Sequence, residues 1–261
     1  MRFATVIRTI LLILTSDLLN SSLQANAYWT RVFLRIEGTE KTIFEGTVLT
    51  TGHIVTTKSG GTHECDGTNN GAHTAPGATI ISAIDDSVST WNGTYYKGIR
   101  DYFITSINRD PPTDDGSWGL LVGYKFAEKG GCQTRVAADD RVLVASGAFA
   151  ASAFLELTAN KQSIPVNGEV TFTVVDGKDR KPVASATVTA GKGEPTGTTG
   201  DKGEPAKIKF GKAGVYKYKA EKKGTIRSNE VTVTVTTTVA STSTNLPPAQ
   251  TGCRHNPGCC D

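Results

Sequence analysis

The sequence has few cysteines and, beyond its N-terminus, no long apolar run. It contains five cysteines, three tryptophans and one methionine in 261 residues. No stretch after residue 27 approaches the roughly 20 apolar residues that a membrane-spanning helix needs, so we expect no membrane span. Arginine is not clustered with aromatic residues, as it is in grooves that bind nucleic acid. We therefore expect no nucleic-acid partner.

Catalytic signatures are also missing. No Gly-x-Ser-x-Gly elbow occurs, and no cysteine and histidine stand in a family signature of nucleophile and base. Pairs of adjacent aspartates occur at 85–86, 114–115 and 139–140. Neighbouring side chains diverge, so these pairs indicate a helix surface and turns, with weak calcium binding as the alternative. We expect no enzyme activity, no catalytic residues, no metal site and no cofactor.

Residues 1–27 have the pattern of a secretory signal peptide. Arg2 and Arg8 make a basic start, an apolar segment follows, and Ala25-Asn26-Ala27 supplies the small-x-small cleavage pattern. The alternative is a buried N-terminal helix. We expect cleavage after Ala27 and a secreted, extracellular protein. The mature chain that remains is long enough for two small domains.

The two halves of the mature chain differ in charge. Residues 28–153 carry 11 basic and 14 acidic side chains, whereas residues 154–236 carry 14 basic and 9 acidic ones. Four lysines of the second half alternate with apolar residues, which predicts that they lie on the water-facing side of strands. The alternative is weak attraction to anionic glycans. These lysines are Lys207, Lys209, Lys217 and Lys219.

Residues 154–236 have the pattern of a small antiparallel sandwich. Short alternating runs recur at spacings of about ten residues, separated by turn sequences such as Asp176-Gly177. Val231, Val233 and Val235 are expected to face the core. The runs are EVTFTVVD, PVASATVTA, AKIKF, GVYKYKAEK and NEVTVTV. In this order they resemble bacterial immunoglobulin-like domains, which implies an all-β immunoglobulin-like sandwich that acts as a spacer or adhesive module.

Residues 28–153 predict an α+β domain. RVFLRIEG and KTIFEGTVLT alternate around a turn and predict a hairpin. In TIISAIDDSV, Ile80, Ala83, Ile84 and Val88 share one helical face, and Thr79 is the expected N-cap. The later runs DYFITSIN, WGLLVGYKF and RVLVAS return to strand character. We expect a grasp-like sheet with one helix on its face.

Six motifs of this region carry a second resemblance. They are RIEG, TIFEG, CDGTNNG, WGLLVGY, GGCQ and DDRVLVA. In this order they are similar to a secreted actinobacterial domain family of unassigned function. That family is distantly related to the C-terminal domain of the transcobalamin and intrinsic-factor proteins, which hold a corrinoid between this domain and a helical barrel. The resemblance implies a transcobalamin-C-terminal-like domain and an extracellular small-molecule, corrinoid-like carrier as one function.

The stretch GGTHECDGTNNGAHTAPG, residues 60–77, has three interpretations. His63, Cys65 and His73 have spacings that a zinc site could use, with His53 on the flanking strand or its turn. The second interpretation is a catalytic site in which Cys65 is the nucleophile. The third is a turn-rich loop in which Cys65 pairs with another half-cystine. Cys132 is the other cysteine of residues 28–153, exported proteins favour such bonds, and the resemblance implies the Cys65–Cys132 disulfide.

Aromatic residues and one glycosylation sequon suggest surface features. Trp91, Tyr95, Tyr96 and Trp118 could form a binding surface, although Trp118 precedes a strand and is expected in the core. Asn92-Gly93-Thr94 is the sequon that remains after cleavage, and in a eukaryotic host it would mark an exposed loop at Asn92.

Residues 237–261 predict a flexible, Ser/Thr/Pro-rich tail. Cys253, Cys259 and Cys260 are an odd number of cysteines, which predicts a reactive thiol or a disulfide-linked partner. A soft-metal site formed by Cys259, Cys260 and His255 is the alternative.

Together these patterns predict a secreted or cell-surface, non-enzymatic binding or adhesion protein with an immunoglobulin-like spacer. A cell-surface molecule or a glycan is the expected ligand. The corrinoid-like carrier is the first alternative function, and an unrecognised secreted enzyme is the second.

Overall fold

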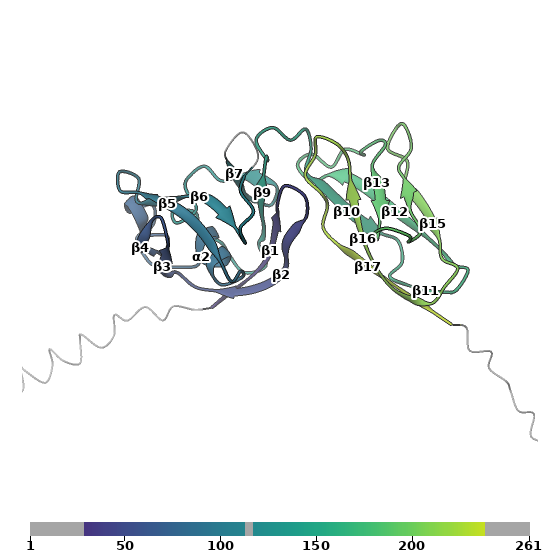
Figure 1. The fold of residues 1–261 in the computed structure, drawn as a ribbon, viewed down its shortest axis with the longest axis horizontal. Helices are drawn as coiled ribbons and strands as arrows, with labels where there is room; N and C mark the ends of the chain where they lie inside the picture. Colours follow the sequence, from purple (N-terminus) through teal and green to yellow (C-terminus); the bar gives the residue numbers. More distant parts are fainter. Residues whose placement is uncertain (1–28, 113–116, 238–261) are drawn as a thin grey trace, which may run out of the picture.

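The computed structural model describes residues 29–112 and 117–237, and this part of the chain is rich in β-strand (Figure 1). The predicted signal peptide, the aspartates at 114–115 and the tail with Cys253, Cys259 and Cys260 lie outside the described residues. Within the described ranges, no helix is long and apolar enough to cross a membrane. Two separate apolar cores divide these residues into an N-terminal unit, residues 29–153, and a C-terminal unit, residues 154–237.

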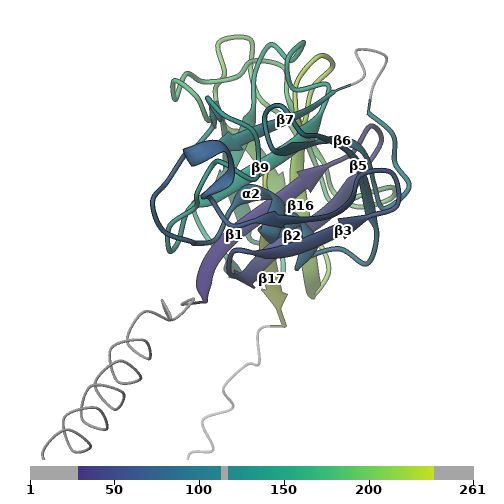
Figure 2. The ribbon, with the colours of Figure 1, turned by 90° about the vertical axis from the view of Figure 1, so that its left-hand side faces the viewer.

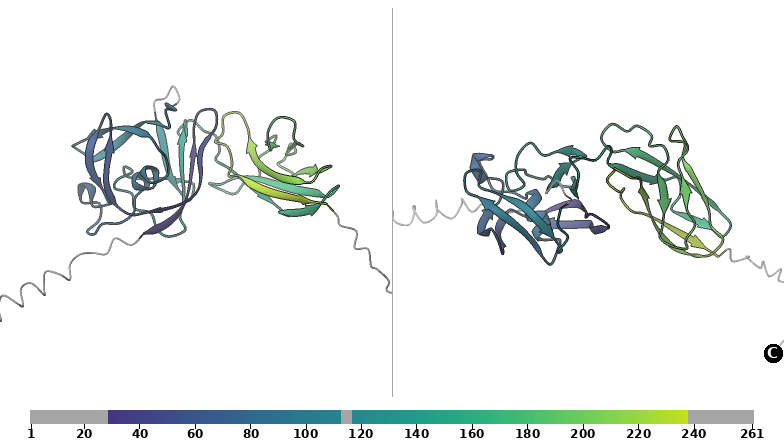
Figure 3. Two further views of the ribbon diagram at one scale, coloured as in Figure 1. Left: turned by 60° about the horizontal axis from the view of Figure 1, so that its bottom comes forward. Right: turned by 45° about the horizontal axis from the view of Figure 1, so that its top comes forward.

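The N-terminal unit is built on a mixed five-stranded sheet with the order β2-β1-β9-β7-β8. The predicted hairpin is confirmed as the antiparallel pair β1–β2, and β1 also pairs in parallel with β9. Figure 2 and the left-hand view of Figure 3 show the strands of this unit around the short helix α2. The elements of the sheet are β1 (Thr30–Glu37), β2 (Thr42–Thr50), β7 (Trp118–Val122), β8 (Lys125–Phe126) and β9 (Arg141–Ser146).

Helix α2 (Ile80–Asp85) begins where the sequence predicts. The Thr79 hydroxyl accepts a hydrogen bond from the backbone N–H of Ser82, and the Ser82 hydroxyl accepts one from the backbone N–H of Thr79, which completes a capping box. The helix is shorter than expected, so Val88 lies beyond it. Residues 80–84 are all buried rather than only one face, and three strands, β1, β2 and β3, contact the helix.

Two small hairpins, β3–β4 and β5–β6, complete the N-terminal unit. They comprise β3 (His53–Thr57), β4 (Gly61–Cys65), β5 (Trp91–Tyr96) and β6 (Asp101–Ile107), with a 3-10 turn, η1, at Asn69–Gly71. The expectation of a loop throughout residues 60–77 is therefore wrong in its first part, because Gly61–Cys65 pair with His53–Thr57. The hydrogen bonds of this hairpin are made by the backbone and do not depend on an alternating apolar pattern. The polar sequence of residues 61–65 therefore gives little indication of a strand.

The C-terminal unit consists of two sheets around the second core. One has the order β10-β12-β15 and the other β11-β17-β16-β13-β14. Val231, Val233 and Val235 face the core as expected, and Lys207 and Lys209 are exposed. The strands are β10 (Leu155–Ala159), β11 (Ser163–Pro165), β12 (Glu169–Asp176), β13 (Thr187–Thr189), β14 (Gly197–Thr198), β15 (Ala206–Lys209), β16 (Gly214–Glu221) and β17 (Val231–Thr236).

A third apolar cluster joins the two units. Leu121 and Leu143 of the N-terminal unit pack with Phe154 and Ile226 of the C-terminal unit. The Tyr124 ring lies so close to Gly177 that a Cβ atom at this glycine would be 2.6 Å from it. The units are therefore packed against one another rather than connected by a bare linker.

Candidate functional site

The cysteine of the stretch at residues 60–77 is part of a disulfide. Cys65, at the end of β4, is bonded to Cys132, and their Cα atoms are 4.6 Å apart. Both residues are fully buried in the first core. The predicted Cys65–Cys132 bond is confirmed, and a bonded sulfur is neither a zinc ligand nor a nucleophile.

Of the three histidines that the sequence places in this region, His63 and His53 have local partners, and His73 is exposed. His63 stacks on the Tyr95 ring, with centroids 3.5 Å apart, and its Nε2 lies 3.0 Å from the carbonyl oxygen of Gly60. His53 begins β3, as expected, and its Nε2 lies 3.1 Å from Asp85. Among the described residues, no three His, Cys, Asp or Glu side chains form a group suited to a metal ion.

His53, Asp85 and Trp91 form a hydrogen-bonded network that connects β3, α2 and β5. Burial alone raises the pKa of Asp85, but hydrogen bonds from His53 and the Trp91 indole, the latter at 2.7 Å, outweigh burial and leave this pKa below its usual value. The hydrogen bond to Asp85 raises the pKa of His53. Asp85 is thus a structural partner and more than a helix-surface residue. In the described structure, neither residue has a hydrogen-bonded serine or cysteine nucleophile.

The predicted aromatic surface is only partly correct. Trp91 and Tyr95 are partly buried against Tyr102, and Trp118 is 6% exposed in the core, as expected. Tyr96 alone of the four is widely exposed, at 52%. Asn92 lies in strand β5, so the expectation of a loop is wrong, and its side-chain amide donates a hydrogen bond to Ser59. Glycosylation of Asn92 stays a prediction.

An aromatic groove lies beside Tyr96 on the N-terminal unit. It has a volume of about 440 Å³ and a mostly apolar lining. The Phe126 and Phe149 rings stack with centroids 4.8 Å apart at one side of it. Sequence reasoning found Tyr96 but missed the others, because they come from β6, β8 and segments between strands. We define the aromatic groove by its exposed apolar side chains, which are Tyr96, Ile99, Phe103, Phe126 and Phe149.

A buried charge network crosses from one unit to the other. The Glu37 carboxylate, at the end of β1, is 1% exposed and lies 2.8 Å from Lys219 Nζ and 2.9 Å from Arg227 Nε. Lys219 also pairs with Glu45 of β2 at 2.8 Å. The expectation that Lys219 is solvated is therefore wrong, since its side chain is only 16% exposed and bridges the two units.

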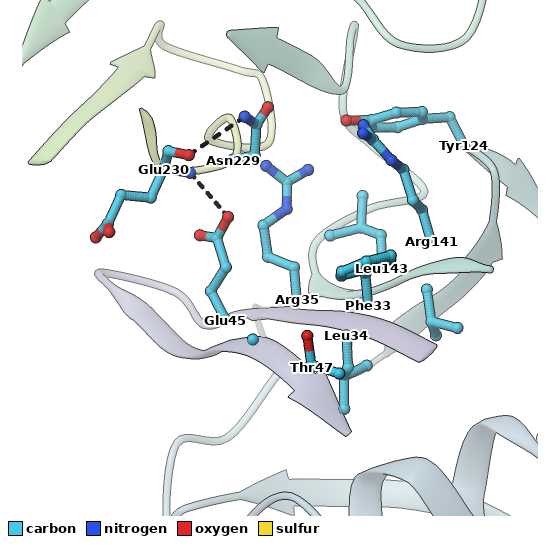
Figure 4. A pocket seen from close by; sticks show the side chains of 12 residues that line it. Phe33, Leu34, Arg35, Glu45, Thr47, Tyr124, Arg141, Leu143, Asn229 and Glu230 are labelled. Atoms are coloured by element: carbon cyan, nitrogen blue, oxygen red, sulfur yellow. Dashed lines mark hydrogen bonds between the residues drawn. The ribbon is translucent and has the colours of Figure 1, made fainter. Parts of the chain in front are cut away.

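An interunit pocket of about 270 Å³ lies next to this network. Figure 4 shows Arg35 pointing from β1 toward Asn229, with Arg141 and Tyr124 on one side and Glu45 on the other. The remaining walls are mainly apolar. No pattern along the sequence predicts this pocket, because its lining comes from both units. The lining comprises Phe33, Leu34, Arg35, Glu45, Gly46, Thr47, Tyr124, Arg141, Val142, Leu143, Asn229 and Glu230.

Comparison with protein-family models gives no match for this chain, and comparison with curated proteins gives no match either. The predicted relations to the actinobacterial, transcobalamin and immunoglobulin-like families stay predictions. The aromatic groove and the interunit pocket are therefore the two candidate sites on which a function can be argued.

Proposed function

We propose that this chain is an exported, non-enzymatic adhesion protein that binds a protein partner at a cell surface through the aromatic groove. The observation that carries this proposal is the concentration of exposed apolar side chains. Among the described residues, ten large apolar side chains are exposed, and five of them line this groove. Exposed apolar surface gathered in one place is typical of interaction sites, and aromatic residues are enriched in protein interfaces.

The polar groups of the groove favour a protein partner over a glycan. Asp101 is 1% exposed and accepts hydrogen bonds from the backbone N–H groups of Tyr102 and Cys132. The Tyr102 hydroxyl donates to backbone carbonyl groups inside the unit. A sugar loses hydrogen bonds to water on binding and needs new partners, whereas an apolar protein segment does not. The groove presents aromatic rings, and few of its polar groups are left to bond to a ligand.

The strand orders support the finer fold assignments. In the C-terminal unit, the β10-β12-β15 sheet faces a sheet that contains β13, β16 and β17, which corresponds to the division of strands A, B and E from C, F and G in immunoglobulin-type sandwiches. In the N-terminal unit, one helix covers a mixed sheet in which the first strand pairs with the last in parallel, as a grasp-like domain requires. The C-terminal unit then serves as a spacer that presents the groove.

The interunit pocket favours the carrier as a second candidate function. Pockets for drug-sized ligands have volumes of about 300–1,000 Å³. At about 270 Å³ the interunit pocket suits a ligand smaller than a corrinoid. The second candidate function is therefore a carrier of a small molecule rather than of a corrinoid.

A cell-binding assay with matched variants tests the adhesion function. Labelled mature protein is added to cells of the producing organism, and binding is compared with that of Phe126→Ser/Phe149→Ser and of a control, Leu49→Ser/Val215→Ser, which removes exposed apolar side chains elsewhere. Truncation of two interface aromatics is expected to weaken binding at least about tenfold. The control should bind like the parent.

Treatment of the cells distinguishes the two kinds of ligand. Surface proteolysis should abolish binding, and periodate oxidation of glycans should leave it intact. Binding that resists protease but is lost after periodate would replace the protein partner with a glycan. Absence of binding, or equal losses in the two double variants, would overturn the assignment to the aromatic groove.

A further inference from the structure

The charge network between the units carries one excess positive charge. Its cations are Arg35, Lys219 and Arg227, and its carboxylates are Glu37 and Glu45. Lys219 contacts both carboxylates at 2.8 Å, and Arg227 contacts Glu37 at 2.9 Å. Three cations thus share two carboxylates, and the distances show which cation lies farthest from a carboxylate oxygen.

That cation is Arg35. Its Nε lies 3.9 Å from Glu37, which is beyond hydrogen-bond distance. The residue is 6% exposed, and its Nη1 is buried without a hydrogen-bond partner among the described residues. A buried donor that lacks an acceptor is costly, most of all on a charged group. In Figure 4 the guanidinium group points into the interunit pocket, where an acceptor could reach it.

The acidic side chains of the pocket are already matched by lysines. Glu45 pairs with Lys219 and accepts a hydrogen bond from the backbone N–H of Glu230 at 2.8 Å. The Glu230 carboxylate pairs with Lys217 at 3.0 Å. Neither acid therefore neutralises Arg35, and the charge that remains in the pocket is positive.

Further donors lie across the pocket from Glu45. The nearest acid to Arg141 is Glu156, at 3.9 Å, and Arg180 already holds Glu156 at 2.6 Å. The Tyr124 hydroxyl is protonated at neutral pH, as phenols with the usual pKa of about 10 are, and burial raises this pKa further, so the hydroxyl can donate a hydrogen bond. The pocket therefore combines two arginines and a phenol with apolar walls.

We propose that the interunit pocket binds a small organic monocarboxylate. The carboxylate pairs with Arg35, whose planar fork suits two-oxygen acceptors, and its single negative charge balances the network. The apolar body of the ligand packs between Phe33 and Leu143. These walls disfavour inorganic phosphate, which has no apolar part to bury.

Isothermal titration of the mature protein with benzoate tests the proposal. Benzyl alcohol, of similar size and without charge, and inorganic phosphate are the comparison ligands. We expect saturable benzoate binding with a dissociation constant of about 1 mM or tighter, and binding of either comparison ligand at least about tenfold weaker.

Variants assign the binding to Arg35. Arg35→Gln should weaken benzoate binding at least about tenfold. Arg31→Gln is the matched control, because Arg31 lies on the same face of β1 but is 56% exposed and paired with Asp139, and its affinity should stay within about twofold. Thr47→Trp fills the pocket from an exposed position, leaves Arg35 in place and should also abolish binding, so the test survives a poorly folded Arg35 variant.

The opposite results would overturn the proposal. They are no saturable binding of benzoate, equal affinity for benzyl alcohol, equal or tighter binding of phosphate, or benzoate binding that is unchanged in both Arg35→Gln and Thr47→Trp.

Discussion

Replacement of Glu37 by glutamine is expected to destabilise the protein and to uncouple its two units. At an effective dielectric constant of about 20, each ion contact of Glu37, with Lys219 or with Arg227, has a gross energy of about 6 kcal/mol. The desolvation of the ions offsets most of this energy, and removal of one partner from a buried pair costs about 3–5 kcal/mol. The glutamine oxygen still accepts one hydrogen bond, so we expect a loss near the lower end, about 3 kcal/mol.

Two spectroscopic signals can follow this uncoupling during urea unfolding. All three tryptophans, Trp29, Trp91 and Trp118, belong to the N-terminal unit, so tryptophan fluorescence reports on that unit alone. Far-ultraviolet circular dichroism reports on the strands of both units. The parent protein should show coincident transitions. In Glu37→Gln the two midpoints should separate.

Glu230→Gln is the matched control, because it removes another acid at the same boundary. Glu230 pairs with Lys217, whose side chain is 67% exposed, so the loss should be within about 0.5 kcal/mol. The reasoning is refuted if both variants lose the same stability, or if the transitions of Glu37→Gln stay coincident.

Three further predictions concern the individual units. Cys65→Ser and Cys132→Ser should each lower the stability of the N-terminal unit by about 4 kcal/mol, because the bond closes a loop of 67 residues, and the double variant should be no worse in the same unfolding assay. The pKa of His53 is raised on folding, so its contribution is full below its unfolded pKa of about 6.5 and is lost as pH rises through the folded value. The stability difference between the parent and His53→Gln should therefore shrink toward pH 9, and a difference that stays constant between pH 5 and pH 9 would contradict this assignment. The fragment 154–237 has its own core and no cysteine, so it should unfold cooperatively with an unchanged midpoint in dithiothreitol; a disordered circular dichroism spectrum would disprove its independence.

The sequence predicts those features of the fold that depend on neighbouring residues. Thr79 before an apolar helical pattern identifies the start of α2, because capping is local chemistry. The alternation of Val231 with threonine identifies the core face of β17. Strands β4 and β5 were not predicted, since polar and glycine residues interrupt their pattern and pairing with a partner strand stabilises them instead.

The candidate sites depend on residues that are distant in sequence. Lys219 occupies an alternating position and has the pattern of a solvated lysine, yet its carboxylate partners lie in β1 and β2 of the other unit. Arg35 likewise alternates with apolar residues, and only the packing of the units shows that it is buried. Local patterns describe each unit separately, whereas these sites form where the units meet.

The parallel pairing of β1 with β9 constrains the order in which the protein can fold. Phe33 lies opposite Arg141, so β1 must wait for more than a hundred further residues before its second edge is covered. A chain made from its N-terminus onward therefore presents the β1–β2 hairpin with an open edge, which is prone to pair with other chains. Cys132 also emerges shortly before β9. Closure of the N-terminal sheet and formation of its disulfide thus become possible at the same stage, after about half of the 261 residues have been made, and long-range pairing of this kind is slow.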